Sequence, residues 1–433
     1  MTRDRPDIVV IGAGAAGLAA ARTALSLGLT VEVLEARDRI GGRAFTDDLV
    51  PGVPWDRGAH WLHDAPRNFF AAFAARRDFA FDRTPSRSYL WGPDGWAGED
   101  VQQERDAYFA RAFAAIKGAG KSGLDVAASE VVPPHPRFRA MFDSWFAAVS
   151  GTEPDRTSTL DDFRYRRAGV NRGVRPGYGA LVAEYGWGLP VRLSTPVACV
   201  RWDGTDVIVE TARGTLGCRA AIVTASTSAL AGGALSFHPP LPAETLDALE
   251  SVPLGEAEKV ALAFDRDVFG LPGNSRLHFE HGTHEAIRFH IRPCGHNVAI
   301  GHVAGRFASE LLAQGPRAMA AFAEEKLVEV FGRGVRQARV ATAATDWKGD
   351  PYIRGGYSCA LPGAADRRMV LREPVGDRVF LAGEACSLTA YGTVHGAHGS
   401  GVEAARRAAA ALGAGAPAPM AADSADSIAG ETA

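Results

Sequence analysis

The stretch 8–43 constrains the fold of this chain more than any other part of the sequence. A short apolar strand is predicted over Ile8–Ile11, and the turn after it contains Gly12, Gly14 and Gly17. Gly12 allows a tight turn, Gly14 lets the backbone approach a pyrophosphate, and Gly17 lets the next helix pack close to the strand. The Ala- and Leu-rich helix predicted over 15–27 would then direct its free N–H groups at the phosphates.

An acid follows at the position that a dinucleotide site requires. A second strand, Val31–Leu34, ends in Glu35, about 20 residues after the glycines, where a carboxylate binds ribose hydroxyls. This acid disfavours a 2′-phosphate and therefore NADP, but the glycine turn alone does not separate FAD from NAD. Beyond it, Gly42 stands between Arg37 and Arg43, an arrangement suited to an extended dinucleotide.

Length and composition indicate a two-domain intracellular protein. The chain has 433 residues, enough for two domains, and its net charge of −3 gives no reason to expect nucleic acid or an anionic membrane as partner. Its five cysteines form no CxxC pair, which favours reduced thiols in a cytoplasm. No apolar leader or membrane-length apolar stretch is present, so we expect a cytoplasmic protein. Nothing in the sequence defines an oligomeric state.

The rest of the chain divides into helical and strand-rich segments. We expect a loop over 47–63, a mostly helical insertion without sheet over 66–188, and a small β-meander that begins at 191. A second sheet is expected over 259–305 and 335–345, a helix over 316–331, a buried strand over 379–382, a long helix over 394–412 and a disordered tail over 413–433.

A second strong motif lies near the C-terminus. The buried strand ends at Gly383 and Glu384, and a helix begins at Gly392, Thr393 and Val394. The N-terminus of such a helix can stabilise negative charge on a bound ring system, and Glu384 could accept hydrogen bonds from a ribityl or ribose chain. With the N-terminal run E-A-x-x-R-x-G-G-R, this G-E-x-x-S…G-T-V-H-G-A pattern resembles the flavin-dependent amine oxidases.

Three intermediate segments are similar to the same family. The run Gly58-Ala59-His60-Trp61-Leu62-His63 resembles the G-A-x-W-I-H segment of the polyamine oxidase branch, which implies that its backbone lines the flavin. His63 would then reach the substrate cavity, whereas His60 is predicted to be structural. The segment 254–260 resembles the one that contains the family's flavin lysine, here Lys259, whose cation beside flavin N5 would assist oxygen reduction. Trp347 and Tyr357 match the family's tryptophan segment and the Gly-x-Tyr-Ser that faces the flavin.

The resemblance implies an α/β fold, with a Rossmann-like FAD-binding domain of the glutathione-reductase type and an inserted α+β substrate domain. The first would comprise 1–65, 191–237 and 351–412, and the second 66–190 and 238–350. The implied catalytic residues are Lys259, His63, Tyr357, Trp347 and Thr393. The implied FAD contacts are Gly12, Gly14, Ala16, Gly17, Glu35, Ala36, Arg37, Gly42, Arg43, Gly58, Ala59, His60, Trp61, Val197, Trp347, Gly383, Glu384, Gly392, Thr393 and Val394.

The implied activity is oxidation of a polyamine or other small amine to an imine, with O2 reduced to H2O2. Thr393 stands where monoamine oxidases have a second tyrosine. A threonine at this position is more similar to the polyamine and lysine-demethylating branches. Gly356 occupies the place of the monoamine oxidase cysteine, so non-covalent FAD is predicted.

Three alternatives stay open. An L-amino-acid oxidase would need an arginine for the substrate carboxylate, which the sequence does not assign. A flavin-dependent desaturase shares the N-terminal fingerprint, and a demethylase subunit would act within a complex. A metal is not predicted, because the histidines over 278–302 match no zinc spacing. Of these, His290 and His302 are candidates for the floor of the substrate cavity.

Overall fold

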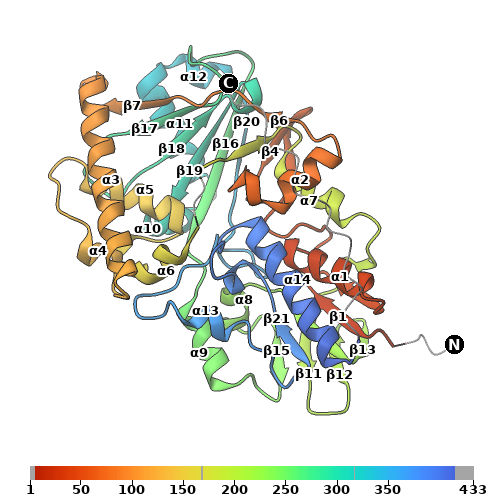
Figure 1. Cartoon of the computed structure of the whole chain (residues 1–433). Helices are drawn as coiled ribbons and strands as arrows, with labels where there is room; N and C mark the ends of the chain where they lie inside the picture. Colours follow the sequence, from red (N-terminus) through yellow and green to blue (C-terminus); the bar gives the residue numbers. More distant parts are fainter. Residues whose placement is uncertain (1–4, 167–168, 316, 415–433) are drawn as a thin grey trace, which may run out of the picture.

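The computed structural model describes residues 5–166, 169–315 and 317–414. Figure 1 shows a parallel sheet with the red helix α1 and the blue helix α14 in one half of the molecule, and a long twisted sheet in the other half. The predicted α/β fold class, with a Rossmann-like unit and a second α+β unit, is confirmed. Most of the tail predicted to be disordered, beyond residue 414, lies outside the described residues.

The first sheet has five parallel strands, and the apolar runs of the four strands other than β10 are buried, as is typical of a parallel sheet. In spatial order its strands are β10 (Val191–Arg192), β2 (Val31–Leu34), β1 (Ile8–Ile11), β14 (Ala220–Val223) and β21 (Val379–Leu381). The chain leaves β1 toward β2 on one side, while β14 lies on the other side. A crevice at the carboxyl ends of β1 and β14 is therefore where a ligand is expected to bind.

Two long helices cover one face of this sheet. α1 (Ala15–Ser26) and α14 (Val394–Ala411) cross closely, because a Cβ at Gly401 would clash with the Ala16 carbonyl oxygen. α2 (Phe69–Arg76) and α7 (Tyr178–Gly186) extend the same core with Phe70 and Leu181. The N-terminal and C-terminal motifs, far apart in the sequence, therefore lie side by side (Figure 1).

The opposite face packs against a four-stranded sheet and three short helices. These elements are β13 (Gly214–Cys218), β12 (Val207–Thr211), β11 (Val197–Arg201), β15 (Ser236–His238), α8 (Thr227–Ala231), α9 (Ala243–Ser251) and α13 (Arg367–Val370). The meander was predicted to begin at 191, which is wrong for its first strand: β10 joins β2, with Val191 opposite Val33. We propose the domain division predicted above with one boundary moved from 238 to about 253, because Ala248 and Leu249 of α9 belong to the core of the first sheet.

The second sheet has seven strands and forms the floor of the other half. In spatial order they are β20 (Arg339–Ala344), β16 (Ala257–Phe264), β19 (Val298–Ala304), β18 (Arg288–Ile291), β17 (Ser275–Phe279), β7 (Ser88–Gly92) and β8 (Gly95–Trp96). One face packs against α10 (Gly305–Ala313), α11 (Ala318–Phe331) and α12 (Gly334–Ala338). The strand predicted over 335–345 is wrong for its first residues, because Val335 and Ala338 are buried at helical spacing.

Two groups of elements pack against the other face of this sheet. At one end the hairpin of β3 (Thr46–Val50) and β4 (Val53–Asp56) packs Trp55 against Ala261 and Ile300. At the other end lies a helical cluster around Leu90. Its helices are α3 (Glu99–Lys121), α4 (Ala128–Val131), α5 (Arg139–Ser150) and α6 (Thr159–Arg164).

Two further local predictions are wrong. The stretch 47–63 contains a hairpin and a strand instead of a loop, and the helical segment 66–188 contributes strands to two sheets. The remaining elements are β5 (Trp61–Leu62), β9 (Arg172–Val174), β6 (Phe81–Asp82), η1 (Ala65–Arg67), η2 (Pro154–Arg156), η3 (Pro293–Gly295) and η4 (Glu384–Cys386). These strands are two to five residues long and pair with distant segments, so alternation in the local sequence is too short to reveal them.

Candidate functional site

The three predicted glycines of the first turn have different surroundings. Gly12 has φ +101°, and a Cβ there would clash with the Thr224 hydroxyl, while a Cβ at Gly17 would clash with the Gly12 carbonyl oxygen. At Gly14 a Cβ would meet no atom within 4 Å. Gly12 and Gly17 are thus packed against protein, and Gly14 borders open space at the N-terminus of α1. The cradle fits a pyrophosphate.

Glu35 is buried beside this turn. Its Oε2 accepts a hydrogen bond of 2.7 Å from the Ala13 N–H, and its Oε1 accepts one of 2.9 Å from the Arg37 N–H. Each oxygen keeps a lone pair, so the carboxylate can still accept a ribose hydroxyl. Arg37 pairs with Asp350, and its buried Nε has no hydrogen-bond partner among the described residues.

Glu384 connects both ends of the chain. Its carboxylate accepts hydrogen bonds from the Arg43 guanidinium (3.0 Å), the Ser358 N–H (3.0 Å), the Ser358 hydroxyl (2.7 Å) and the Gly392 N–H (2.6 Å). Burial opposes its ionisation, but Arg43, Arg368 and these donors lower the pKa of Glu384 below its usual value. A small hollow beside it is lined by Arg43, Glu384 and the segments that end β14 and β21. The residue therefore organises the cradle, and a direct contact with FAD stays a prediction.

A buried ion pair, Arg368 with Asp161, contacts the same Ser358 hydroxyl that donates to Glu384. Arg368 and Asp161 are at most 2% exposed and form two hydrogen bonds of 2.8 and 2.9 Å. Arg368 also donates to the Ser358 hydroxyl (2.8 Å) and lies under the Tyr391 ring, 3.8 Å from its centroid. No sequence pattern indicated this pair, because its members are 207 residues apart and belong to no motif.

The predicted residues at the start of α14 form its N-terminal cap. The Thr393 hydroxyl accepts from the Gly396 N–H at 3.0 Å and donates to the Ala390 carbonyl at 2.6 Å. Gly392, at φ +67°, turns its own N–H toward Glu384. Val394 is the first helical residue, so the positive end of the α14 dipole lies at this cap.

Lys259 lies on β16 of the second sheet, beside the backbone at the end of β4. Its Nζ donates to the carbonyl oxygens of Asp56 (3.0 Å) and Gly58 (2.5 Å), and burial lowers the pKa of Lys259 to about 8. The Trp347 ring packs against Gly58, and its Nε1 donates to the Arg57 carbonyl at 3.2 Å. Lys259 and Trp347 therefore hold the 57–59 segment from two sides.

Arg43 also binds the 57–59 segment, because its carbonyl oxygen accepts a hydrogen bond of 3.1 Å from the Ala59 N–H. His60 pairs with Asp56 (Nδ1 to Oδ2, 2.8 Å), and the Trp61 ring lies 5.2 Å from the His290 ring. The contact between Trp61 and His290 of β18 connects the predicted lining segment to the sheet that contains Lys259.

Tyr357 and His63 are the other predicted catalytic side chains. The Tyr357 hydroxyl donates to the Ala148 carbonyl, and burial raises the pKa of Tyr357 to about 12. A Cβ at Gly392 would lie 3.5 Å from the Tyr357 Cβ, so the tyrosine adjoins the start of α14. His63 Nδ1 is 3.2 Å from the Asn171 Oδ1, and burial lowers the pKa of His63.

Four predicted residues have less distinctive environments. Ala16 is buried in α1 beneath Gly401, and Val197 is buried on β11 with its side chain in the core. Gly42 has φ +57° and lies against the Gly14 Cα, whereas Ala36 is half-buried after Glu35.

The sequence analysis missed four residues of this region, Asp56, Asp161, Arg288 and Arg368. Of these, only Arg288 had a sequence signal, the strand-like alternation in AIRFHIR.

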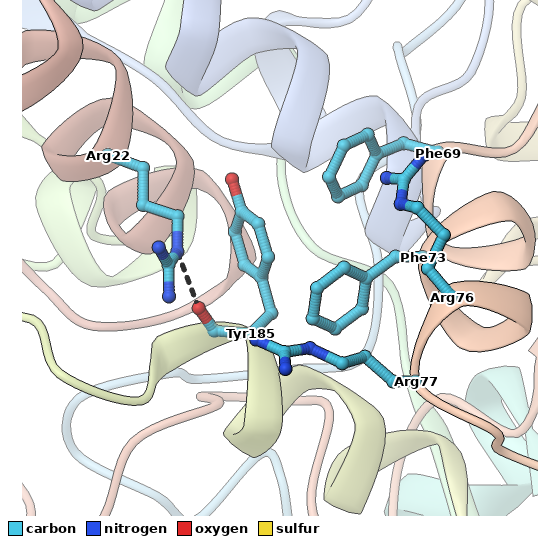
Figure 2. A pocket seen from close by; sticks show the side chains of 6 residues that line it. All are labelled: Arg22, Phe69, Phe73, Arg76, Arg77 and Tyr185. Atoms are coloured by element: carbon cyan, nitrogen blue, oxygen red, sulfur yellow. Dashed lines mark hydrogen bonds between the residues drawn. The ribbon is translucent and has the colours of Figure 1, made fainter.

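Another hollow lies on the surface of the molecule. This concavity has a volume of about 420 Å³ and is lined by Phe69, Phe73, Tyr185 and three arginines, Arg22, Arg76 and Arg77 (Figure 2). The Arg22 Nε donates to the Tyr185 carbonyl at 2.7 Å, the bond drawn in Figure 2. None of these six residues belongs to the predicted site.

The described ranges hold neither a metal cluster nor a membrane-spanning helix. Residues 5–166, 169–315 and 317–414 contain no group of three His, Cys, Asp or Glu side chains that could hold a metal ion. Within the same ranges, none of the helices combines the length and apolar character needed to cross a membrane.

This fold and cradle define a dinucleotide-binding protein. The family model described as flavin containing amine oxidoreductase matches residues 15–91 and 73–409. The chain therefore belongs to the flavin-containing amine oxidoreductases, which confirms the predicted family, an enzymatic oxidoreductase role and FAD as the cofactor.

Named relatives agree with this assignment. The chain is 28% identical to polyamine oxidase 4 of Oryza sativa subsp. japonica, over 92% of this chain and 88% of that protein. It is also 28% identical to lysine-specific histone demethylase 2 of Homo sapiens, over 93% of this chain but only 53% of that protein. The chain thus spans about half the length of that demethylase.

Solved structures show the fold. A double mutant of putrescine oxidase superposes with a TM-score of 0.78 at 19% identity, covering 94% of this chain and 99% of that one. Cyclohexylamine oxidase from Brevibacterium oxydans IH-35A gives a TM-score of 0.77 at 20% identity, covering 94% and 100%.

Proposed function

We propose that this enzyme oxidises the carbon–nitrogen single bond of an amine to the double bond of an imine. Two electrons and two protons leave the amine, and molecular oxygen accepts them to form hydrogen peroxide. The observation that carries the proposal is Lys259, a buried lysine whose Nζ is held by the carbonyl oxygens of Asp56 and Gly58. Relatives and neighbours named for oxidation of polyamines, putrescine and cyclohexylamine support it.

FAD, when bound, supplies the two-electron acceptor and passes the electrons to oxygen. The protein supplies a fixed positive charge at Lys259 in a site of low dielectric. There it stabilises the negative charge that develops as oxygen is reduced. Because the pKa of Lys259 is about 8, the ammonium form predominates at pH 7.

Two other side chains prepare the amine. The Tyr357 ring forms a wall beside the start of α14, which excludes water and restricts the orientation of the amine. His63 is uncharged near neutral pH, and its Nδ1–H donates to Asn171. We propose that its Nε2 accepts the proton of the incoming ammonium, leaving the amine nitrogen uncharged for oxidation.

The reaction is tested with purified holoenzyme. Putrescine, spermidine, aromatic monoamines and amino acids are mixed with it without oxygen, and bleaching of the flavin absorbance is followed. At least one amine should bleach the flavin and, in air, produce peroxide. If none does, the proposed reaction is wrong. Acid precipitation should also release the flavin into solution, because the attachment is proposed to be non-covalent.

The role of Lys259 is tested separately with Lys259→Met. Reoxidation of the reduced flavin by oxygen should slow about 100-fold, while reduction by the amine changes much less. Lys326→Met is the matched control, since Lys326 is a surface lysine that pairs with Glu329 on α11. Equal losses in both half-reactions would remove Lys259 from the oxygen step.

A further inference from the structure

A row of basic side chains crosses the second sheet beside the proposed oxygen site. Lys259 of β16 is directly opposite His302 of β19, and His302 is directly opposite Arg288 of β18. Residues directly opposite in a sheet point to the same face, so these three lie on the face that the helices α10 and α11 do not cover. Arg288 is therefore two strands from Lys259, about 10 Å at the backbone.

Arg288 adjoins the aromatic wall of the site. Its Nη2 lies 3.4 Å from the Ala148 carbonyl oxygen, to which the Tyr357 hydroxyl also donates. The Trp145 ring centroid is 5.9 Å from its Cζ. Arg288 and Tyr357 thus meet at one backbone oxygen, which places the guanidinium beside the tyrosine that faces the start of α14.

Arg288 has no anionic partner within the described part of the chain. No ion pair joins it to a carboxylate there, and the 3.4 Å contact with Ala148 is at the long limit for a hydrogen bond. The Tyr357 hydroxyl stays protonated and gives its hydrogen to Ala148. Burial lowers the pKa of Arg288 to about 10, which reflects a half-buried charge that its surroundings do not compensate.

The neighbouring groups do not neutralise this charge. Burial lowers the pKa of His278 to about 3 and the pKa of His302 well below its usual value, so both imidazoles are uncharged. Arg276, on the same face, adds a second cation over the Trp61 ring. Asp56, a carboxylate that lies near Lys259, is already held by His60 and the Thr46 hydroxyl.

A purely structural role does not account for such an arginine. Arginines that are removed from water are normally paired, because an unpaired charge in a protein interior is costly. The five N–H groups of Arg288 make one long contact within the described protein, which leaves the planar fork available for a ligand. A carboxylate matches that fork with two parallel hydrogen bonds.

We propose that Arg288 binds a carboxylate of the amine substrate, so that this enzyme acts on an amino carboxylate and not on a di- or polyamine. The inference rests on the proposed amine oxidation and specifies its substrate class. The second ammonium of a diamine would meet Arg288, with Arg276 and Lys259 nearby, and like charges repel most strongly where water is excluded. A carboxylate at the same position would complete the missing ion pair.

The test compares amines matched for shape but not for charge. Flavin reduction without oxygen is measured for 4-aminobutanoate against putrescine, 6-aminohexanoate against 1,6-diaminohexane, and L-phenylalanine against 2-phenylethylamine. In at least one pair the carboxylate member should reduce the flavin at least tenfold more efficiently. In Arg288→Gln that preference should fall about 100-fold, through weaker binding, while reduction by the member without a carboxylate changes little. Arg288→Lys should restore part of the preference.

A binding measurement separates this inference from the reaction itself. Pentanoate, which has no amine to oxidise, should shift the flavin absorbance of the wild-type holoenzyme. Its Kd should rise about 100-fold in Arg288→Gln but not in the control Arg266→Gln, whose arginine is exposed beside Asp265. Faster reduction by diamines, or an equal loss for both members of a pair, would overturn the inference and leave amine oxidation standing. If no amine of either charge bleaches the flavin, amine oxidation itself fails.

Discussion

Glu384→Gln is expected to loosen the connection between the N-terminal and C-terminal halves of the FAD cradle. The carboxylate accepts hydrogen bonds from the Arg43 guanidinium, two Ser358 groups and the Gly392 N–H. A glutamine keeps one acceptor oxygen and places an NH2 group against the donors of the other. Two of the four hydrogen bonds therefore become donor–donor contacts, and the negative charge opposite Arg43 and Arg368 is lost.

The magnitude follows from these contacts. A hydrogen bond to a charged group contributes about 1.5 to 3 kcal/mol, and breaking a buried ion pair costs about 3 to 5 kcal/mol. We expect Glu384→Gln to lower the free energy of unfolding of the apoprotein by about 3 to 5 kcal/mol at pH 7, and to weaken FAD binding as well. Urea unfolding followed by circular dichroism measures the first quantity, and titration with FAD measures the second.

The pH dependence gives an independent check. The folded-state pKa of Glu384 is lower than its ordinary value of 4.5, so its stabilisation is complete above pH 4.5 and is lost as the pH falls through the folded-state pKa. The difference between wild type and Glu384→Gln should therefore shrink in acid. Glu403→Gln, which removes a 40% exposed partner of Arg372 and Arg407, should cost at most about 1 kcal/mol. A loss below about 1 kcal/mol for Glu384→Gln with FAD affinity unchanged would refute this reasoning.

Three further predictions concern the cradle, its support and the oxygen step. Gly14→Ala should change the free energy of unfolding of the apoprotein by no more than about 1 kcal/mol and weaken FAD binding at least tenfold. Gly17→Ala should lower that free energy by about 1 to 3 kcal/mol, because the added Cβ would clash with the backbone. Equal losses of the two variants in urea unfolding would contradict this prediction. Asp161→Asn should cost about 3 to 5 kcal/mol by leaving its buried arginine unpaired, and the exposed control Asp366→Asn less than about 1 kcal/mol. The rate constant for flavin reoxidation should fall as the pH rises through about 8, where Lys259 loses its proton, and Lys259→Met should lack this step in stopped-flow measurements.

Prediction from sequence succeeded where the interacting residues are close together in the chain. The strand, glycine turn, helix and acid between Ile8 and Glu35 form one continuous unit, so each feature can be recognised from its neighbours. The start of α14 at Val394 was likewise indicated by a local pattern. Short strands such as β6 and β9 were missed, because a two- or three-residue strand is specified by its partner and not by its own sequence.

The sequence by itself determined that this chain has a dinucleotide cradle at its N-terminus and an amine oxidase motif near its C-terminus. The surroundings of Lys259 and Arg288 were decided only by the tertiary structure. Lys259 is buried because the 56–58 backbone, some 200 residues earlier, supplies its two acceptors. Arg288 adjoins Tyr357 because α5 places Ala148 between them, and no carboxylate from the described segments reaches it. The charge around a side chain depends on contacts between distant segments. The local sequence therefore predicted the reaction class, and the three-dimensional arrangement is the basis of the proposed substrate class.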